Sequence, residues 1–483
     1  MWKKLALFSL IVSPLMLFGQ NDQDAIRYGI VKPHGTSRAQ SLGGAINALG
    51  ADLSNASGNV AGLGVFRKSQ ASFTFDVSIS PTKSNFLGSI NKDTKTTAGI
   101  GNGGFMYSIR HGDEKKTKGM LFSNIYVGYN KLNNFNKRVL SSGINSESSF
   151  LEPWLQNVNS GYGSNFYEGL AVNSELLFQP DPGSPFMAFD LPWPNFEKQQ
   201  TKETLGKGSL GEVNFAYAGN VSNKLFFGAS FNINTLNYKE TSIYTESEVG
   251  NNDLVPEFNY FTFEEAFSTK GTGYNLKFGV IYRPVDLVRF GLSFHTPTWF
   301  TMTDKFKNKM LAYYDNGNKV EAESPDGFYR YRYVAPLKVN ASVAFVIGRK
   351  ASIGGEYEYS PTNMTKFKEY NGSIMPLTET LKSFLQTVHT VRLGGEYKVG
   401  LAGFRAGVFY GTSLTQKALN NPMSVLGISA GVGFKLPSGF YLDFAYQYMQ
   451  SKYNFYLYRS DLVDATYNSQ QWHTPSLTLG VAF

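Results

Sequence analysis

Cysteine is absent from the 483 residues of this chain. Disulfides, thiolate metal sites, cysteine nucleophiles and lipid anchors on cysteine are therefore excluded. Charged residues are also few, at 17%, and the formal net charge is +8. This composition argues against intrinsic disorder, a coiled coil and a highly charged helical bundle.

Long apolar runs are absent except at the N-terminus. Lys3 and Lys4 precede an apolar stretch over residues 5–18, which Gly19 and Gln20 follow. A basic start, a short apolar core and a small residue before a polar segment predict a signal peptide over residues 1–19. The stretch is too short to cross a bilayer core of about 30 Å as a helix. No later run reaches 18 apolar residues, so a membrane protein with this sequence has to be a β-barrel.

Aromatic residues, by contrast, are abundant at 15%, and many lie in segments where apolar residues alternate with polar or small ones. In the last segment Leu477, Leu479 and Val481 share one face, and small or hydroxyl-bearing residues occupy the other. A membrane barrel shows this period because one face meets lipid and the other a lumen. A soluble β-sandwich also alternates, so the number and spacing of the segments have to decide.

Fourteen segments alternate in this way. They are residues 71–79, 103–110, 120–129, 211–219, 224–237, 272–282, 287–295, 337–347, 351–360, 388–398, 403–411, 425–434, 439–450 and 473–483. Long connections (80–102, 130–210, 238–271, 296–336, 361–387, 412–424 and 451–472) alternate with short ones. An even strand count with long loops at one rim predicts an all-β, 14-stranded antiparallel transmembrane β-barrel over residues 71–483, with multiple passes through a bacterial outer membrane.

Residues 20–70 precede the first strand and lack this alternation. Small residues dominate in Gly43-Gly44-Ala45, in Ala48-Leu49 ahead of Asp52, and in Asn59-Val60-Ala61-Gly62-Leu63. In these motifs the chain resembles the FadL-type family of outer-membrane transport proteins. The N-terminal hatch of that family carries a Gly-Gly-Ala stretch, an Ala-Leu then Asp stretch and an Asn-Pro-Ala-Gly-Leu motif, and Val60 stands here where the family has Pro.

This resemblance covers residues 35–66 in motif. It implies that residues 20–70 form a hatch that plugs the barrel. It also implies passive uptake of hydrophobic compounds, such as long-chain fatty acids, across the outer membrane. The implied hatch residues are Arg38, Gly43, Gly44, Asp52, Asn59 and Gly62.

The alternation also assigns charged side chains of both signs to the lumen. They are Asp76, Glu212, Lys277, Arg289, Lys338, Glu356, Glu358, Arg392, Glu396, Arg405 and Asp443. Because buried charges are costly unless paired, we expect them to pair with one another and with Arg38 and Asp52. The alternative is a hydrophilic pore. In either case a hydrophobic site has to lie high in the barrel or among the loops.

Connection 130–210 is the expected place for ligand collection, because it is longer than a passive loop needs to be. Ser149, Glu152 and Pro153 predict the start of a helix there. The candidate ligand-binding residues of this connection are Trp154, Leu155, Phe166, Leu170, Leu176, Leu177 and Phe178. Alternatively, these side chains only pack the loop against itself and the rim.

Histidine is rare in the sequence. There are five histidines, and the metalloprotease motif His-Glu-x-x-His does not occur, so we expect no enzyme, no catalytic residue, no metal site and no cofactor. The positive charge forms no cluster beyond Lys115-Lys116. This argues against nucleic acid and fits attraction to anionic outer-membrane lipid.

Two alternatives to passive transport of a hydrophobic small molecule remain. The first is a structural or secretion-accessory barrel that docks partner proteins. The second is a haem-binding outer-membrane receptor that uses His34 or His295.

Overall fold

A computed structural model describes residues 27–28, 32–189, 196–249, 258–419, 421 and 423–483. The predicted signal peptide, residues 1–19, lies outside the described residues.

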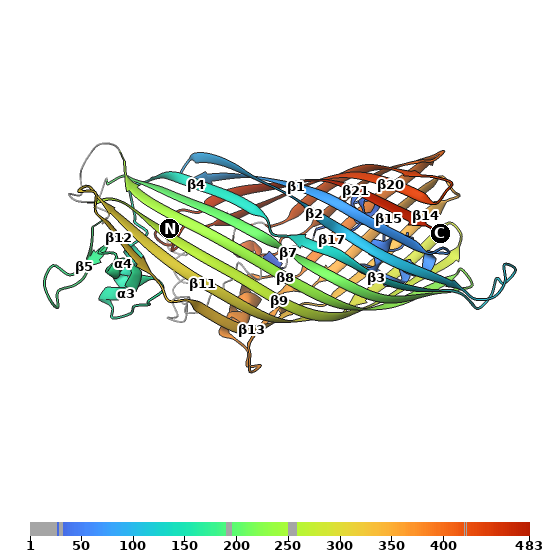
Figure 1. Ribbon diagram of the computed structural model, residues 1–483, viewed down its shortest axis with the longest axis horizontal. Coiled ribbons are helices and arrows are strands. Elements are labelled where there is room, and N and C mark those ends of the chain that lie inside the picture. Colours follow the sequence, from blue (N-terminus) through green and yellow to red (C-terminus); the bar gives the residue numbers. More distant parts are fainter. Residues whose placement is uncertain (1–26, 29–31, 190–195, 250–257, 420, 422) are drawn as a thin grey trace.

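Within this described part, fourteen antiparallel strands form the wall of a barrel. They are β1 (Gln70–Phe86), β2 (Ser89–Arg110), β3 (Met120–Asn134), β7 (Lys198–Val221), β8 (Leu225–Glu248), β9 (Phe258–Val285), β10 (Val288–His295), β14 (Lys338–Ile347), β15 (Ala351–Ser360), β17 (Val388–Val399), β18 (Ala402–Gly411), β19 (Val425–Lys435), β20 (Phe440–Phe455) and β21 (Thr466–Ala482). Each pairs with the next, and β21 pairs with β1, which closes the sheet (Figure 1). The predicted all-β, 14-stranded antiparallel barrel is confirmed.

The two faces of the wall differ in chemistry. On β1, for example, Ser72 and Thr74 are buried inside, whereas Phe73 and Phe75 are 45% and 44% exposed outside. Outward aromatic and aliphatic side chains on neighbouring strands continue this surface, which we call the apolar belt. A closed barrel leaves no unpaired strand edge, and its apolar belt suits lipid contact.

Several strands are longer than the alternation predicted. Residues 80–102 form strand on both sides of a tight turn at Leu87-Gly88, and residues 238–271 are largely strand. The predicted long connections 80–102 and 238–271 are therefore wrong. Beyond the apolar belt both faces become polar, as in Thr82-Lys83-Ser84. The backbone period continues there without a matching alternation in hydropathy.

The predicted connection 296–336 is also mostly strand. After Thr296-Pro297 the chain continues as β11 (Thr298–Tyr314), which pairs with the upper part of β9. β12 (Lys319–Glu323), β13 (Gly327–Ala335) and β16 (Lys366–Glu369) extend the wall beside it. The wall therefore continues past the apolar belt here, and β11 and β12 extend towards the end of the barrel opposite the C-terminus (Figure 1).

The longest connection spans residues 135–197 and contains its own elements. They are β4 (Lys137–Asn145), which joins the wall, α3 (Glu152–Asn159), α4 (Glu168–Asn173), and the short pair β5 (Leu177–Phe178) and β6 (Met187–Ala188). A helix begins where it was predicted, with Pro153 in the first turn of α3, but its N-cap residue is Leu151 and not Ser149. α3 and α4 lie at the end of the barrel opposite the C-terminus (Figure 1). No helix of the described chain is both long and apolar enough to cross a membrane.

Residues 32–69, called the N-terminal segment, lie inside the barrel. Their helical turns are α2 (Ser37–Ser41), η1 (Leu53–Ala56) and η2 (Val60–Val65), and most of their side chains are buried. The Ser37 amide donates to Thr478 Oγ1 at 2.8 Å and Asn59 Nδ2 donates to the Val280 carbonyl at 3.1 Å. The N-terminal segment is thus bonded to strands on different sides of the wall.

A row of asparagine side chains crosses six strands of the inner wall. Each Nδ2 donates to the next acceptor over 2.6–3.0 Å, in the order Asn102, Asn130, Asn214, Asn232, Asn275 and finally Thr298 Oγ1. The row joins β2, β3, β7, β8, β9 and β11. Buried amides are costly unless bonded, and here each amide satisfies its neighbour.

The remaining elements lie at the long-connection rim. They are η3 (Thr362–Met364), α5 (Pro376–Phe384) and η4 (Lys417–Leu419). At the opposite rim the strands are joined by the six short turns that the sequence predicted, near residues 111–119, 222–224, 286–287, 348–350, 400–401 and 436–439.

Candidate functional site

The lumen around the N-terminal segment is lined by ion pairs. Lys277 Nζ lies 2.5 Å from Glu212 Oε1, and Arg392 contacts Glu356 at 2.5 Å and Glu358 at 3.1 Å. Four of these five side chains are at least 94% buried and Glu358 is 92% buried. The expected pairing of the lumenal charges is confirmed for these residues, whereas Arg289 donates to the Leu49 carbonyl instead of pairing with a carboxylate. We call this part of the lumen the charged half.

The N-terminal segment takes part in the same network. Arg38 lies 3.6 Å from Asp52 and 3.5 Å from Glu396 of β17. Asp52 accepts hydrogen bonds from Thr36 Oγ1 and from the Ser54 amide, which fixes the start of η1. Arg38 therefore joins the segment to the wall with a half-buried charge.

The other predicted hatch residues act through the backbone. Gly43 adopts φ +63° and a Cβ there would lie 3.0 Å from the Val408 amide nitrogen, so only glycine suits this approach. Gly44 and Gly62 are similarly close to Arg392 and Asn55. The Asn59 side chain accepts from the Ala61 amide at the start of η2.

Above the N-terminal segment, the inner wall becomes apolar. A buried cluster forms around β8, β11 and β13, with α5 packed against it. It includes Leu236, Tyr238, Phe300, Met302, Tyr331, Tyr333, Phe367, Leu381, Leu385 and Leu414. We call this the apolar half of the lumen.

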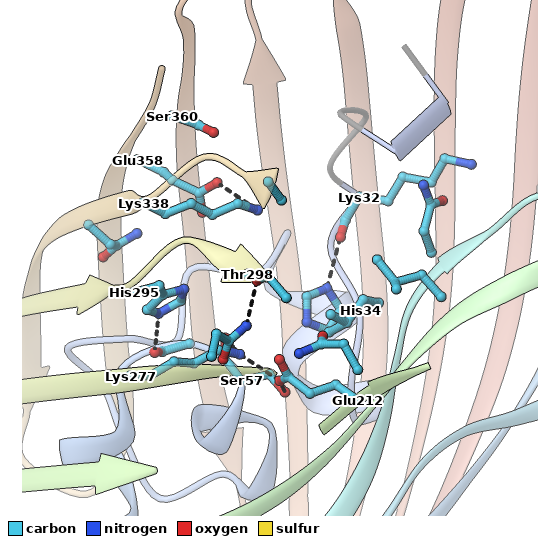
Figure 2. A pocket seen from close by; sticks show the side chains of 18 of the residues that line it. Lys32, His34, Ser57, Glu212, Lys277, His295, Thr298, Lys338, Glu358 and Ser360 are labelled. Carbon is cyan, nitrogen blue, oxygen red and sulfur yellow. Dashed lines mark hydrogen bonds and ion pairs between the residues drawn. The ribbon is translucent and has the colours of Figure 1, made fainter. Parts of the chain in front are cut away.

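A cavity of about 170 Å³ lies where the two halves meet (Figure 2). Leu210, Leu236 and Phe300 line it from the apolar half, and charged residues of the wall line it from the other. The N-terminal segment contributes Lys32 and His34, and Figure 2 shows His34 on the side of the Lys277–Glu212 pair with Lys32 farther from it. A ligand in this cavity would meet both an apolar wall and polar groups.

The two histidines of the haem alternative both line the cavity. His34 Nδ1 bonds to the Lys32 carbonyl at 3.0 Å, and His295 Nε2 bonds to the Gly58 carbonyl at 2.8 Å. Since a carbonyl only accepts, each of these ring nitrogens carries the proton. Burial lowers the pKa of His34 to about 4, so this ring is neutral near pH 7. In the described part of the chain, no three His, Asp or Glu side chains are grouped so as to hold a metal ion.

The predicted ligand-binding residues occupy a cap formed by residues 150–189. Trp154, Leu170, Leu176 and Leu177 are at least 92% buried in one cluster, which also contains Phe263 of β9. Leu155 packs partly against this cluster. The structure therefore brings five of the seven predicted residues together.

The other two predicted residues lie at the margin of the cap. Phe166 packs on Phe306 of β11, with ring centroids 5.1 Å apart, and Phe178 packs on Phe189 at 4.5 Å. Both side chains are half-buried. Neither belongs to the buried cluster around Trp154.

The apolar half of the lumen is the part that the sequence prediction missed. Phe300 and Met302 lie in residues 296–336, and Leu236 stands at the end of a predicted strand. The missed signal was the alternation of Phe300 and Met302 with Thr301, and of Tyr331 and Tyr333 with Arg332. Because threonine and arginine fill outward positions such as Thr301, Thr303, Arg330 and Arg332, this stretch did not resemble a lipid-facing strand.

Solved structures with the same fold cover nearly all of the chain. The toluene transporter TodX of Pseudomonas putida matches with a TM-score of 0.56 at 13% identity, over 94% of this chain and 99% of its own. A FadL homologue of Pseudomonas aeruginosa matches with a TM-score of 0.56 at 12% identity, over 94% and 100%. The chain has the fold of the FadL-type channels.

The toluene transporter TbuX of Ralstonia pickettii gives a similar result, with a TM-score of 0.52 at 13% identity over 93% of this chain and 99% of its own. Neither a family model nor a curated protein matches the sequence. The resemblance to FadL-type proteins seen in residues 35–66 is thus confirmed as a likeness of fold over almost the whole chain. A closed barrel of this fold, with an apolar belt, is the architecture of an outer-membrane protein.

Proposed function

We propose that this chain is a FadL-like channel that admits hydrophobic compounds passively across a bacterial outer membrane. The observation that carries the proposal is the apolar half of the lumen. The inner wall is polar in the charged half but apolar here, where it carries Leu236, Phe300, Met302, Tyr331 and Tyr333. Buried apolar contact contributes about 25 cal/mol for each Å² removed from water, which favours an apolar solute there.

The path begins at the cap and ends at the N-terminal segment. The cap offers Trp154, Phe166 and Leu177 close to the rim, and the apolar half leads from there to the cavity. The N-terminal segment fills the lumen beyond the cavity and acts as the hatch, held by Arg38, Asp52 and Asn59. A compound passing farther has to displace part of this segment or move around it.

The class of compound is proposed on chemistry alone. TodX and TbuX are described as toluene transporters, whereas the apolar half with a polar cavity below it suits an amphipathic chain such as a long-chain fatty acid. We propose fatty acids first and small aromatic hydrocarbons second. No contact in the described residues favours docking of a partner protein or haem over these.

A paired substitution tests the proposal. Phe300→Ser with Met302→Ser should weaken binding of a fluorescent long-chain fatty acid to the purified protein at least tenfold, because two buried apolar contacts are lost. Phe328→Ser is the matched control, since Phe328 lies on the paired strand and faces outward, 60% exposed. Unchanged binding in the double variant would exclude the apolar half as the path. Displacement by toluene but not by fatty acid would assign the channel to aromatic compounds.

A further inference from the structure

A set of basic side chains occupies the outer face of β9, β11, β13 and β16. The apolar belt ends there at Tyr274 and Trp299, which are paired across β9 and β11 and are 47% and 52% exposed. Basic residues occupy outward positions in the row of this pair and in the next three rows towards the long-connection rim. We call them the basic band: Lys270, Lys305, Arg330, Arg332, Lys366 and Lys368.

Register places members of the basic band side by side. Arg332 pairs directly with Lys368, and Thr303 separates Lys270 from Arg330 in the next row. Like charges directly opposite each other destabilise a sheet. The Arg332–Lys368 pair is therefore unfavourable unless an anion lies against it.

A second pair of like charges, Lys207 and Lys239, lies in the same row of the sheet as Lys305. Ser268 pairs with Lys305 on one side and with Lys239 of β8 on the other. Lys239 in turn pairs with Lys207 of β7. The positive surface thus extends over neighbouring strands of the wall.

Carboxylates are excluded from this surface but not from the rows beyond it. In the described part of the chain, no member of the basic band forms an ion pair, and the outward positions between them carry Thr272, Thr301 and Thr303. Farther from the belt on β11, Lys307 lies 2.6 Å from Glu323 of β12, and Lys309 pairs with Glu321 of the same strand β12. A surface that needed only solubility would mix the two signs throughout, so the separation points to an anionic partner beside the belt.

Two members of the basic band share one aromatic ring. The guanidinium carbon of Arg330 lies 4.5 Å from the centre of the Tyr370 ring, and that of Arg332 lies 5.6 Å from it. Stacking limits the freedom of both side chains before any ligand arrives. Guanidinium groups can hydrogen-bond two oxygens of a phosphate at once, which lysine cannot do.

We propose that the basic band binds the phosphate groups of an anionic lipid in the leaflet that surrounds the long-connection rim. Neighbouring strands are about 4.8 Å apart and alternate residues about 6.8 Å apart, so a single headgroup can reach several of these cations. The position at the edge of the apolar belt favours a lipid, whose chains would lie along the belt, over a soluble anion. The inference rests on the proposed membrane location and is independent of the transported compound.

The test compares two sets of four substitutions in the detergent-purified full-length protein. One variant carries Lys270→Gln, Arg330→Gln, Arg332→Gln and Lys368→Gln. The control carries Arg110→Gln, Lys115→Gln, Lys116→Gln and Lys118→Gln at the short-turn rim, which removes the same charge. Each is titrated with dioleoyl phosphatidic acid and, separately, with dioleoylglycerol, and bound lipid is counted by native mass spectrometry.

Wild type and control should bind phosphatidic acid, and the band variant should bind it at least tenfold more weakly. Dioleoylglycerol should not distinguish the three proteins. Equal binding of phosphatidic acid by the band variant overturns the proposal, and so does displacement of the lipid by an equal concentration of inorganic phosphate, which would indicate a site for a free anion.

Two further measurements separate other causes of failure. All forms should keep the change in gel mobility on heating that reports a folded barrel. Arg330→Lys with Arg332→Lys should bind more tightly than the band variant because it keeps the charge, and more weakly than wild type because lysine cannot bond two phosphate oxygens at once. Binding of the fluorescent fatty acid should be equal in the band variant and wild type. A loss of fatty-acid binding in wild type itself would count against the proposed transport function and not against the basic band.

Discussion

The charged and apolar halves of the lumen are built on the same strands and yet solve different problems. On β9, Lys277 and Asn275 face the charged half, whereas Phe263 and Phe261 face the cap farther along. Every ion of the charged half needs a partner, and the N-terminal segment supplies several. The apolar side chains have no such requirement, so contacts among them can be exchanged for contacts with a ligand at little cost. A firmly held plug and an adaptable path can therefore occupy one barrel.

Removing the plug should have the largest effect, because it exposes the charged half of the lumen to water. Deletion of residues 35–64 leaves the polar wall around Glu212 and Asn214 facing water, and the protein should then conduct ions in planar bilayers, where the full-length chain conducts little or none. A deletion of residues 112–117, in a turn at the short-turn rim, is the control and should not raise conductance. Unchanged conductance after removal of residues 35–64 would place the plug elsewhere.

Breaking one ion pair should destabilise the charged half by a smaller amount. Lys277→Met leaves Glu212 buried without its cation, which costs about 3–5 kcal/mol. Unfolding in denaturant, followed by the gel mobility of the barrel, measures the loss, and the double change Glu212→Gln with Lys277→Met should recover most of it. Lys307→Met, in the exposed pair with Glu323, should leave the midpoint where it is. A Lys277→Met protein as stable as wild type would contradict this account.

Substitution in the cap should alter ligand binding and leave the barrel intact. Trp154→Ser with Leu177→Ser removes two side chains from the cluster around Phe263, and binding of the fluorescent fatty acid should fall at least tenfold, or about 1.4 kcal/mol. Tyr162→Ser, in the same connection and 61% exposed, is the control. If the double variant binds as wild type does, the cap only packs against the rim and the ligand enters by the apolar half alone.

A further expected effect concerns the pH dependence of plug stability. The pKa of His34 is lowered to about 4 by burial, against an ordinary value near 6.5. The unfolded chain therefore binds more protons than the folded one between pH 6.5 and 4, and stability should fall with falling pH by up to about 1.4 kcal/mol per pH unit. His34→Asn should flatten this slope in denaturant titrations made at several pH values. An identical slope in the variant would assign the acid sensitivity to other groups.

The sequence was sufficient for the parts whose chemistry is local. Segments such as 473–483 were found because lipid outside and a polar lumen inside impose opposite chemistries on alternate residues. The alternation also assigned Glu396 to the lumen and predicted that lumenal charges would pair with Arg38 and Asp52, but it did not predict which charge pairs with which. The wall partner of Arg38, Glu396, is far away in sequence, and only the closed barrel brings the two within 3.5 Å.

The parts that could not be predicted are those where inward and outward residues have similar polarity. Lys83 and Thr82 are both polar although one faces out and one faces in, so the upper strands looked like loops. Phe300 and Met302 were overlooked for the related reason that their outward neighbours meet water or headgroups instead of lipid chains. Within the apolar belt, hydropathy predicts which residues share a face of the sheet. The cross-strand partner of each residue depends on the register of the strands, which hydropathy does not specify beyond the belt.

The asparagine row has a consequence for how the barrel assembles. Its amides all point the same way around the wall, from Asn102 to Thr298, so each strand between the two ends accepts from one neighbour and donates to the other. If one strand were inserted a single residue out of step, its asparagine would face the lipid chains and two neighbours would be left with unsatisfied groups. A strand out of register is therefore penalised by unsatisfied amides on the strands beside it, and the row helps to specify the register of the wall from β2 to β11.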